Sequence, residues 1–259
     1  MRVLVCTKQI PDPADPPSLD PSTWTLKRDG KVILDDSDSY GVEMALQLAD
    51  QAGGGNVSLV SMVPRGETSG LRSALAMGAD QALVISDDAL AGSDALATAK
   101  VLAAAARRLE PDLVLAATES TDGYTGTVPA QLAELLGWPS VTFARHVEVN
   151  DGRLSVQRQT EGGYDEVECP LPAVVTVTAG AVEPRYPSFR GIVAARAKPV
   201  EQLTVADLGL SPEEVGRAGA RQEVMTVAAA EGRGGGQVVE DDGDGHQRII
   251  AFLEERKIV

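Results

Sequence analysis

The alternation of short apolar runs with longer segments of helical periodicity is the feature that most restricts how this chain folds. The apolar runs are typical of strands buried on both faces of a sheet, and they cover Val3 to Cys6, Val57 to Val63 and Ala82 to Ile85. The segments between them carry apolar residues at helical spacing, through Val42 to Ala49, Leu71 to Ala76 and Asp94 to Leu109. Strands that alternate with helices of crossover length predict a doubly wound α/β domain with a mainly parallel sheet.

The stretch from Pro111 to Pro139 adds a candidate ligand site to this pattern. A buried strand over 112–117 leads into a loop of small and polar residues, and an apolar helical pattern begins at Val128. This order places free backbone N–H groups and the positive end of a helix at the carboxyl edge of the sheet, where a phosphate binds well. Gly123 and Gly126 allow close approach of the main chain, and Thr125 and Thr127 add hydroxyl donors. The alternative is an ordinary βα turn in which these residues only cap the helix, and the residues alone leave both interpretations open.

Local signals also predict the smaller elements. Residues 25–34 are typical of a hairpin that turns at Asp29-Gly30, and the prolines from Pro11 to Pro21 argue against regular pairing before it. Asp38 or Ser39 is the expected cap of the first helix, and Ser93 or Asp94 that of the third.

The pattern changes after Pro139. Alternating strands separated by Asn-Asp-Gly and Gly-Gly turns predict an antiparallel section over about 140–170, followed by a buried strand at 172–177. We expect a nucleotide-binding domain over 1–227, a Gly- and Asp-rich flexible linker over 228–245 and a short amphipathic helix over 246–259. That helix either folds back on its own domain or reaches a partner subunit.

Composition excludes several functional classes. A net charge of −15 argues against binding to nucleic acid or to an anionic membrane surface. The two cysteines and two histidines have no metal-ligand spacing, so no metal site is predicted. With no apolar run of membrane-spanning length and no signal peptide, the expected location is the cytoplasm.

Four motifs in register resemble the β subunit family of electron transfer flavoproteins, including its bifurcating and nitrogen-fixation-linked relatives. RVLVCTKQIPD (Arg2 to Asp12) resembles the family's first strand and loop, and TSGLRSALAMGAD (Thr68 to Asp80) its second helix. STDGYTGTVPAQLAELLGWP (Ser120 to Pro139) resembles its nucleotide loop, and AVEPRYPSFRGIVAARAKPV (Ala181 to Val200) the segment that presents its partner-recognition loop. The closing RIIAFLEERKIV is similar to the family's terminal helix.

The resemblance implies an electron carrier rather than an enzyme, with an α/β core of the adenine-nucleotide α-hydrolase-like type. Such a chain pairs with an α subunit, and the redox FAD is bound mainly by that α subunit. The heterodimer accepts electrons from flavin-dependent dehydrogenases. The β subunit binds AMP, or in bifurcating members a second FAD. Carried over by position, the nucleotide contacts fall at Cys6, Asp35, Asp36, Ser37, Asp38, Met62, Ala117, Thr118, Ser120, Asp122, Gly123, Tyr124, Thr125, Gly126, Thr127 and Val128.

The sequence departs from the family at several of these positions. Asp35-Asp36-Ser37-Asp38 stands where Asn-Pro-aromatic-Asp is usual, Tyr124 replaces an Asp of bifurcating members and Thr127 replaces a Gln. An aromatic found near Pro13 in some members is also missing. These departures favour AMP over a second FAD as the bound nucleotide.

A basic stretch lies between Glu183 and Glu201, where the chain has no acidic residue. Its cations surround two apolar side chains, Phe189 and Ile192, which is typical of a docking surface. The resemblance places Phe189 as an apolar anchor for the partner dehydrogenase, with Arg185, Tyr186, Arg190 and Ile192 around it. The alternative is that Arg185 and Arg190 pair with internal carboxylates and Phe189 packs in the core.

Two other classes of function share this fold. A stand-alone adenine-nucleotide-binding protein of the stress type would leave Ala181 to Val200 and the terminal helix unexplained. A nucleotide-hydrolysing ligase would require a Ser-Gly-Gly-x-Asp-Ser loop after the first strand, which this sequence lacks. The carboxylates at Glu161, Asp165 and Glu168 fit the solvated face of a strand better than a catalytic set.

Overall fold

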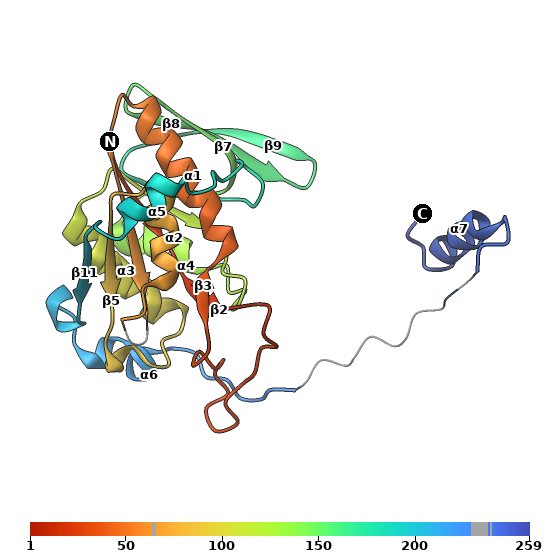
Figure 1. Cartoon of the computed structure of the whole chain (residues 1–259), viewed down its shortest axis with the longest axis horizontal. Coiled ribbons are helices and arrows are strands. Elements are labelled where there is room, and N and C mark those ends of the chain that lie inside the picture. The colour runs from red at the N-terminus through yellow and green to blue at the C-terminus, as the bar shows by residue number, and fades with distance from the viewer. Residues whose placement is uncertain (64–65, 229–237, 239) are drawn as a thin grey trace. The chain divides into compact units, whose positions relative to one another are not determined.

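A computed structural model of the chain describes residues 1–63, 66–228, 238 and 240–259, and Figure 1 shows its elements. The chain falls into two compact units, Met1–Val224 and Met225–Val259. In the described part of the chain, none of the helices is both long and apolar enough to cross a membrane.

A nine-stranded mixed sheet forms the centre of the Met1–Val224 unit. Its strands follow the order β11 (Val200–Leu203), β5 (Gln81–Ile85), β4 (Asn56–Met62), β1 (Arg2–Cys6), β6 (Leu113–Ala117), β10 (Ala173–Val177), β7 (Ser140–Asn150), β8 (Arg153–Thr160) and β9 (Gly163–Pro170). All neighbours from β11 to β7 are parallel, and β7, β8 and β9 pair antiparallel. The predicted doubly wound sheet with an antiparallel extension is therefore confirmed.

Helices cover both faces of the parallel strands. On one face the apolar cluster includes side chains of α1 (Asp36–Gln51), α2 (Ser69–Met77) and α5 (Phe189–Ala195), and on the other those of α3 (Ala95–Leu109) and α4 (Val128–Leu136). The strands alternate between the two clusters, so that Val3 and Val5 face one side and Leu4 faces the other. Short 3₁₀ turns at Asp88–Leu90, Ala206–Leu208 and Pro212–Glu214 and the one-turn α6 (Gly216–Gly219) complete the unit.

The predicted hairpin over 25–34 is wrong in its pairing. β3 (Val32–Leu34) pairs antiparallel with β2 (Gln9–Pro11), not with the residues just before Asp29. Pro11 is tolerated because it ends the strand, and Gln9 and Ile10 supply the ladder. Residues 12–31 form an excursion closed by the Asp12 N–H on the Lys31 carbonyl at 3.0 Å, and Leu19 bridges to Leu26 within it.

The predicted N-cap is confirmed for α3 and is wrong for α1. Asp94 caps α3, accepting the N–H of Ala97 at 2.8 Å, as expected. The cap of α1 is Asp35 rather than Asp38 or Ser39, because Asp35 is where the extended chain of β3 turns into the helix. Asp38 instead lies in the first turn of α1, where its side chain is buried.

The strand order fixes where a ligand site is expected. From β1 the chain crosses to β4 and β5 on one side, and then returns through α3 to β6 on the other side of β1. The connections therefore diverge between the carboxyl ends of β1 and β6, which is the position where open α/β sheets bind their ligands.

The Met225–Val259 unit contains the helix α7 (Gly245–Glu255). Most of the predicted linker, residues 229–237 and 239, lies outside the described residues. None of the α7 residues, all of them described, is buried, although Ile249, Ile250 and Phe252 are large and apolar.

Candidate functional site

The loop that follows β6 is tied to the start of α1 by one buried carboxylate. Asp35, fully shielded from solvent, accepts the N–H and hydroxyl of Thr121 at 2.8 and 3.1 Å. It also accepts the N–H and hydroxyl of Ser37 at 3.1 and 2.7 Å. Four donors therefore occupy this carboxylate, which fixes the loop relative to the helix.

A second carboxylate ties the same loop to the segment after β1 and to the excursion over 12–31. Asp122 accepts from the Lys8 ammonium at 2.6 Å and from the Arg28 guanidinium. Lys8 also donates to the Ser120 hydroxyl at 3.1 Å, and Arg28 to the Gln9 carbonyl at 3.3 Å. The three charged groups link the segments that follow β1 and β6.

Two further titratable groups, Asp38 and Cys6, lie beside these residues. Burial raises the pKa of Asp38 well above its ordinary value of 3.8, and the neighbouring charges of Asp35 and Asp122 add to the shift despite a 2.6 Å hydrogen bond from the Lys8 N–H. Burial, with the charge of Asp38, raises the pKa of the Cys6 thiol to about 12. Both shifts favour the protonated form of the group, and the raised pKa keeps the Cys6 thiol protonated at neutral pH.

The start of α4 provides backbone donors at the end of the loop that follows β6. The first N–H groups of a helix have no partner within it, and the side chain of Thr127, at the N-cap, makes no capping bond among the described residues. Gly126 precedes it with a φ of +66°, a conformation that favours glycine, and Tyr124 adopts a φ of +48°. Unpaired N–H groups at a helix start are the kind of donors that bind an anion.

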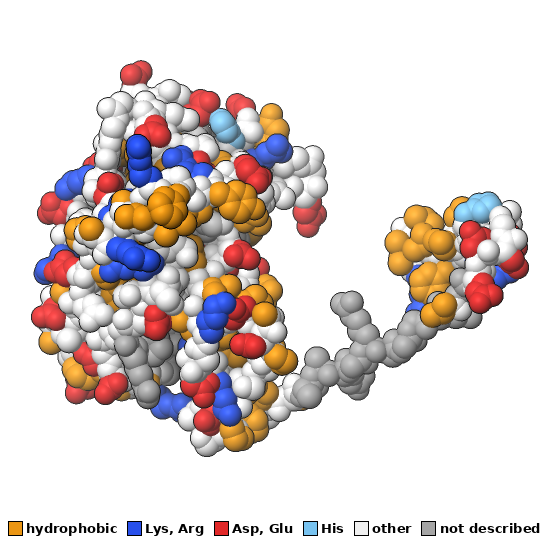
Figure 2. Space-filling model, viewed as in Figure 1, with side chains coloured by type: hydrophobic (Ala, Val, Ile, Leu, Met, Phe, Trp, Pro, Cys, Tyr) orange, Lys and Arg blue, Asp and Glu red, His pale blue; other side chains and the backbone are white. Residues whose placement is uncertain are grey.

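A separate surface is formed by α5 and the residues before it. Tyr186 and Phe189 are 93% and 83% exposed, and Ile192 and Val193 are about half exposed. Figure 2 shows hydrophobic side chains gathered over α5 with basic side chains beside them. We call Tyr186 to Ala195 the docking segment.

The docking segment is held at both ends by side chains of the domain. Before it, Arg185 forms a two-point ion pair with Glu43 of α1, at 2.6 and 2.9 Å. At its end, Arg72 donates to the Ala195 carbonyl at 2.6 Å, and Lys198 donates to three carbonyls at the end of α2. The segment is thus fixed in place while its large apolar side chains stay in solvent.

Comparison with known proteins decides the family. A family model described as an electron transfer flavoprotein domain matches residues 23–208. The electron transfer flavoprotein subunit beta of Mycobacterium leprae is 38% identical over 264 residues, which cover 100% of this chain and 99% of that protein. This chain belongs to the electron transfer flavoprotein β subunit family.

Other proteins are similar over comparable lengths. That of Thermoanaerobacterium thermosaccharolyticum is 35% identical over 262 residues and 100% of both chains. The subunit CarD of the caffeyl-CoA reductase-Etf complex of Acetobacterium woodii is 37% identical over 241 residues and 92% of both chains. The family is flavin-associated and its role is electron transfer, so this chain is an electron-transfer subunit whose family works with an α subunit and with dehydrogenases.

In this chain, the predicted nucleotide contacts lie at the carboxyl ends of three neighbouring strands, in the loop that follows β6 and at the starts of α1 and α4. Cys6 ends β1, Met62 ends β4 and Ala117 ends β6, and the loop over 118–127 leads to Val128 of α4. Asp35, Asp36, Ser37 and Asp38 lie where α1 begins, joined to this loop through Asp35 and Thr121. The alternative interpretation was that Arg185 and Arg190 pair with internal carboxylates and that Phe189 packs in the core. It holds for Arg185, which pairs with Glu43. It does not hold for Phe189, which is exposed, or for Arg190, which forms no ion pair with any residue that the structure describes.

Sequence reasoning missed the cations and the carboxylate that organise both places. Lys8 and Arg28 bracket Asp122 from segments more than 90 residues away, with separations of 114 and 94. Glu43 reaches Arg185 across 142 residues. Lys8 directly follows a predicted strand, which is the signal that could have identified it.

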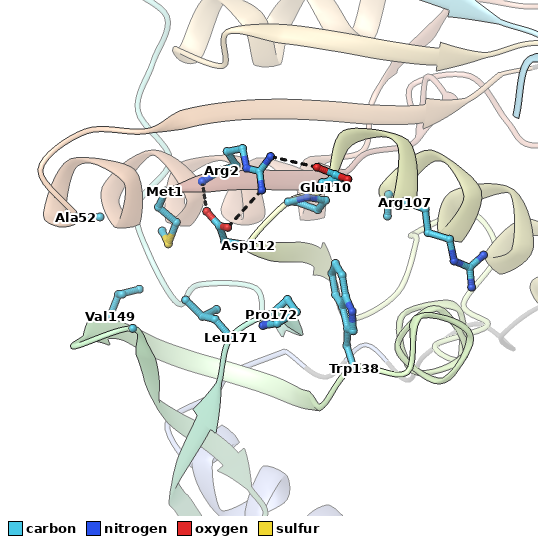
Figure 3. A pocket seen from close by; sticks show the side chains of 13 residues that line it. Met1, Arg2, Ala52, Arg107, Glu110, Asp112, Trp138, Val149, Leu171 and Pro172 are labelled. Atoms are coloured by element: carbon cyan, nitrogen blue, oxygen red, sulfur yellow. Dashed lines mark hydrogen bonds and ion pairs between the residues drawn. The ribbon is translucent and has the colours of Figure 1, made fainter.

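The described part of the chain also contains a hollow of about 750 Å³ at the opposite, amino edge of the sheet (Figure 3). Met1, Trp138, Leu171 and Pro172 line it, and Arg2 pairs there with Glu110 and Asp112 at 3.8 and 3.7 Å. Because ligands in open α/β sheets bind at the carboxyl edge, this hollow is not the candidate nucleotide site.

Proposed function

We propose that this chain is the β subunit of a heterodimer in which the α subunit carries FAD and the β subunit holds one AMP as a structural ligand. The heterodimer shuttles electrons, in the cytoplasm, from flavin-dependent dehydrogenases to a downstream acceptor. The bound flavin supplies the redox chemistry, and the β subunit contributes orientation and surroundings. The similarity to named β subunits over the whole chain supports this proposal.

The observation that carries the AMP proposal is the arrangement between β1 and β6. The start of α4, with Gly126 before it, offers backbone N–H groups to a phosphate. The nearby charges offset one another in part: Lys8 and Arg28 are cations beside the carboxylates of Asp35 and Asp122, and burial favours the protonated form of Asp38. Glu119 is a further carboxylate beside Gly126, and it is exposed to solvent.

The remaining groups of the site suit a nucleoside. Cys6 and Met62 present half-buried, uncharged side chains at the strand ends. Asp38, whose burial favours the protonated form, adds a polar group beside them. These residues fit an adenosine better than they fit a metal or a free polyanion.

We further propose that α7 packs on the α subunit. Its unit leaves Ile249, Ile250 and Phe252 without burial, and such an amphipathic helix gains stability by covering an apolar groove. Truncation after Gly243 is expected to weaken the heterodimer while leaving the Met1–Val224 unit folded.

The docking segment is proposed to contact the partner dehydrogenase, with Phe189 as its anchor. A rigidly held segment with two large, almost fully exposed aromatic side chains is typical of an interaction surface. Phe189→Ala is expected to slow reduction by the dehydrogenase and to leave the heterodimer and its nucleotide intact. Unchanged reduction kinetics would remove this role.

One experiment separates the proposed function from its alternatives. The chain is co-expressed with its α subunit, the complex is denatured, and released flavin and AMP are counted per heterodimer. One flavin and one AMP support the proposal, whereas two flavins without AMP would make this a bifurcating-type subunit with a second FAD. A chain that purifies alone with an adenine nucleotide and no flavin would be a stand-alone nucleotide-binding protein.

A further inference from the structure

Glu43 is a buried carboxylate whose hydrogen bonds all point toward the docking segment or support that contact. Its side chain is 5% exposed, although it lies in the middle of α1. One oxygen accepts Nε of Arg185 at 2.6 Å and the Arg185 backbone N–H at 3.3 Å. The other accepts the second guanidinium nitrogen at 2.9 Å and the Gln47 amide at 2.9 Å. Both the side chain and the main chain of Arg185 are therefore fixed by one residue.

The pair is charged on both sides. Burial by itself would raise the pKa of Glu43, but the hydrogen bonds from Arg185 and Gln47 outweigh it, so that the pKa lies below its ordinary value of 4.5. The hydrogen bond to Glu43 raises the pKa of Arg185. A two-point contact of this kind holds a guanidinium in one orientation.

The position of this pair matters because the segment it anchors cannot hold its own shape. α5 has seven residues, which is too few for a helix to be stable alone. Gly191 lies so close to α2 that an added Cβ would overlap the Ala76 carbonyl, so the helix rests directly on its neighbour. Arg72 and Lys198 fix the end of the segment, and Arg185 fixes its beginning, directly before Tyr186.

We propose that Glu43 is a positioning residue for partner docking: it holds Arg185 so that Tyr186 and Phe189 are presented in one orientation. Because the Arg185 guanidinium is bound to Glu43, it does not contact the partner. This inference rests on the proposed docking function. Without Glu43 the partner must order the beginning of the segment on binding, which weakens association but leaves electron transfer in the formed complex unchanged.

The test compares Glu43→Gln, Arg185→Gln and the double variant in the full heterodimer. The probe is the flavin-dependent dehydrogenase of the source organism that reduces the wild-type heterodimer fastest, and KM for the heterodimer and kcat are measured. Each single variant is expected to raise KM about fivefold, the size expected when one or two side chains must be ordered on binding, with kcat unchanged. The double variant is expected to be no worse than either single one, since both remove the same contact.

Glu168→Gln is the matched control, because Glu168 forms an exposed ion pair with Arg153 at 3.7 Å on the antiparallel extension. Thermal unfolding of each heterodimer checks the fold. If Glu43→Gln impairs folding, Arg185→Lys replaces it, because this is a milder change at a side chain that is 41% exposed. Arg185→Lys is expected to give the same KM increase.

Three outcomes would overturn the inference in distinguishable ways. If Arg185→Gln raises KM while Glu43→Gln lowers it or leaves it unchanged, Arg185 contacts the partner directly and Glu43 does not position it. If Phe189→Ala also leaves KM unchanged, the docking segment does not contact the dehydrogenase, and the proposed role of Glu43 is refuted as well. A Phe189→Ala effect without a Glu43→Gln effect refutes the positioning role alone.

Discussion

Asp122→Ala removes the carboxylate that joins Lys8 and Arg28 to the loop after β6, and we predict a clear loss of stability. The Asp122 side chain is 6% exposed, whereas those of Lys8 and Arg28 are 39% and 28% exposed. A hydrogen bond to a charged group contributes about 1.5–3 kcal/mol, and two are lost. Because the two cations regain water in the variant, the loss is expected near the lower limit, about 3 kcal/mol.

A loss of about 3 kcal/mol lowers the midpoint of thermal unfolding by about 6–12 °C in a domain of this size. The effect has a defined pH dependence. Burial alone would raise the pKa of Asp122, but the hydrogen bonds and charges of Lys8 and Arg28 outweigh it and hold the pKa below 3.8. The carboxylate therefore stabilises the fold above pH 3.8, and wild type and variant converge as the pH falls through the lowered pKa.

Scanning calorimetry of the heterodimer measures the midpoints, and Asp165→Ala serves as the matched control. Asp165 is 64% exposed in its side chain and lies 3.7 Å from Arg158, so this surface pair contributes only about 0–1 kcal/mol. AMP content after gel filtration is expected to fall in Asp122→Ala only. Equal midpoints for the two variants would refute the reasoning.

Three further predictions concern other parts of the domain. Asp38→Asn removes a group whose pKa is raised in the folded state, so wild type should lose stability relative to this variant as the pH rises above 3.8. Denaturant unfolding at pH 4.5 and about pH 7.5 measures the difference in stability, and a wild type that gains stability relative to the variant would contradict the prediction. Leu115→Ala, at a fully buried position in β6, should cost about 3–5 kcal/mol by the same method, and a loss near zero would mean that the core repacks. Gly191→Ala should push α5 off α2, and amide exchange of residues 189–195 should increase; unchanged exchange would show that the Ala76 carbonyl moves aside.

The sheet could be predicted from the sequence because its signals are local. Runs such as Val3 to Cys6 and Leu113 to Ala117 are apolar without alternation, which indicates burial on both faces, and both are fully paired strands. Asp94 was identifiable as a cap because it directly precedes the apolar periodicity of α3. The hairpin over 25–34 failed since Asp29-Gly30 indicates a turn but does not tell which strand follows it. The partner of Val32 to Leu34 proved to be Gln9 to Pro11, beyond a 20-residue excursion.

The charged contacts could not be predicted for a related reason. Lys8, Asp122 and Arg28 contact each other because β1 and β6 are neighbours in the sheet. No local sequence pattern predicts that strand order. Glu43 occupies an ordinary position of an amphipathic helix, so its role became visible only with Arg185 beside it.

The central claim is that an adenylate lies between the carboxyl ends of β1 and β6 with its phosphate at the start of α4. A crystal structure of the purified heterodimer tests it most directly. The account predicts electron density for one AMP between these strand ends, with phosphate oxygens accepting hydrogen bonds from backbone N–H groups near Gly126 and Val128. Density for the nucleotide at the amino edge of the sheet, or a crevice filled by the chain's own side chains, would contradict it.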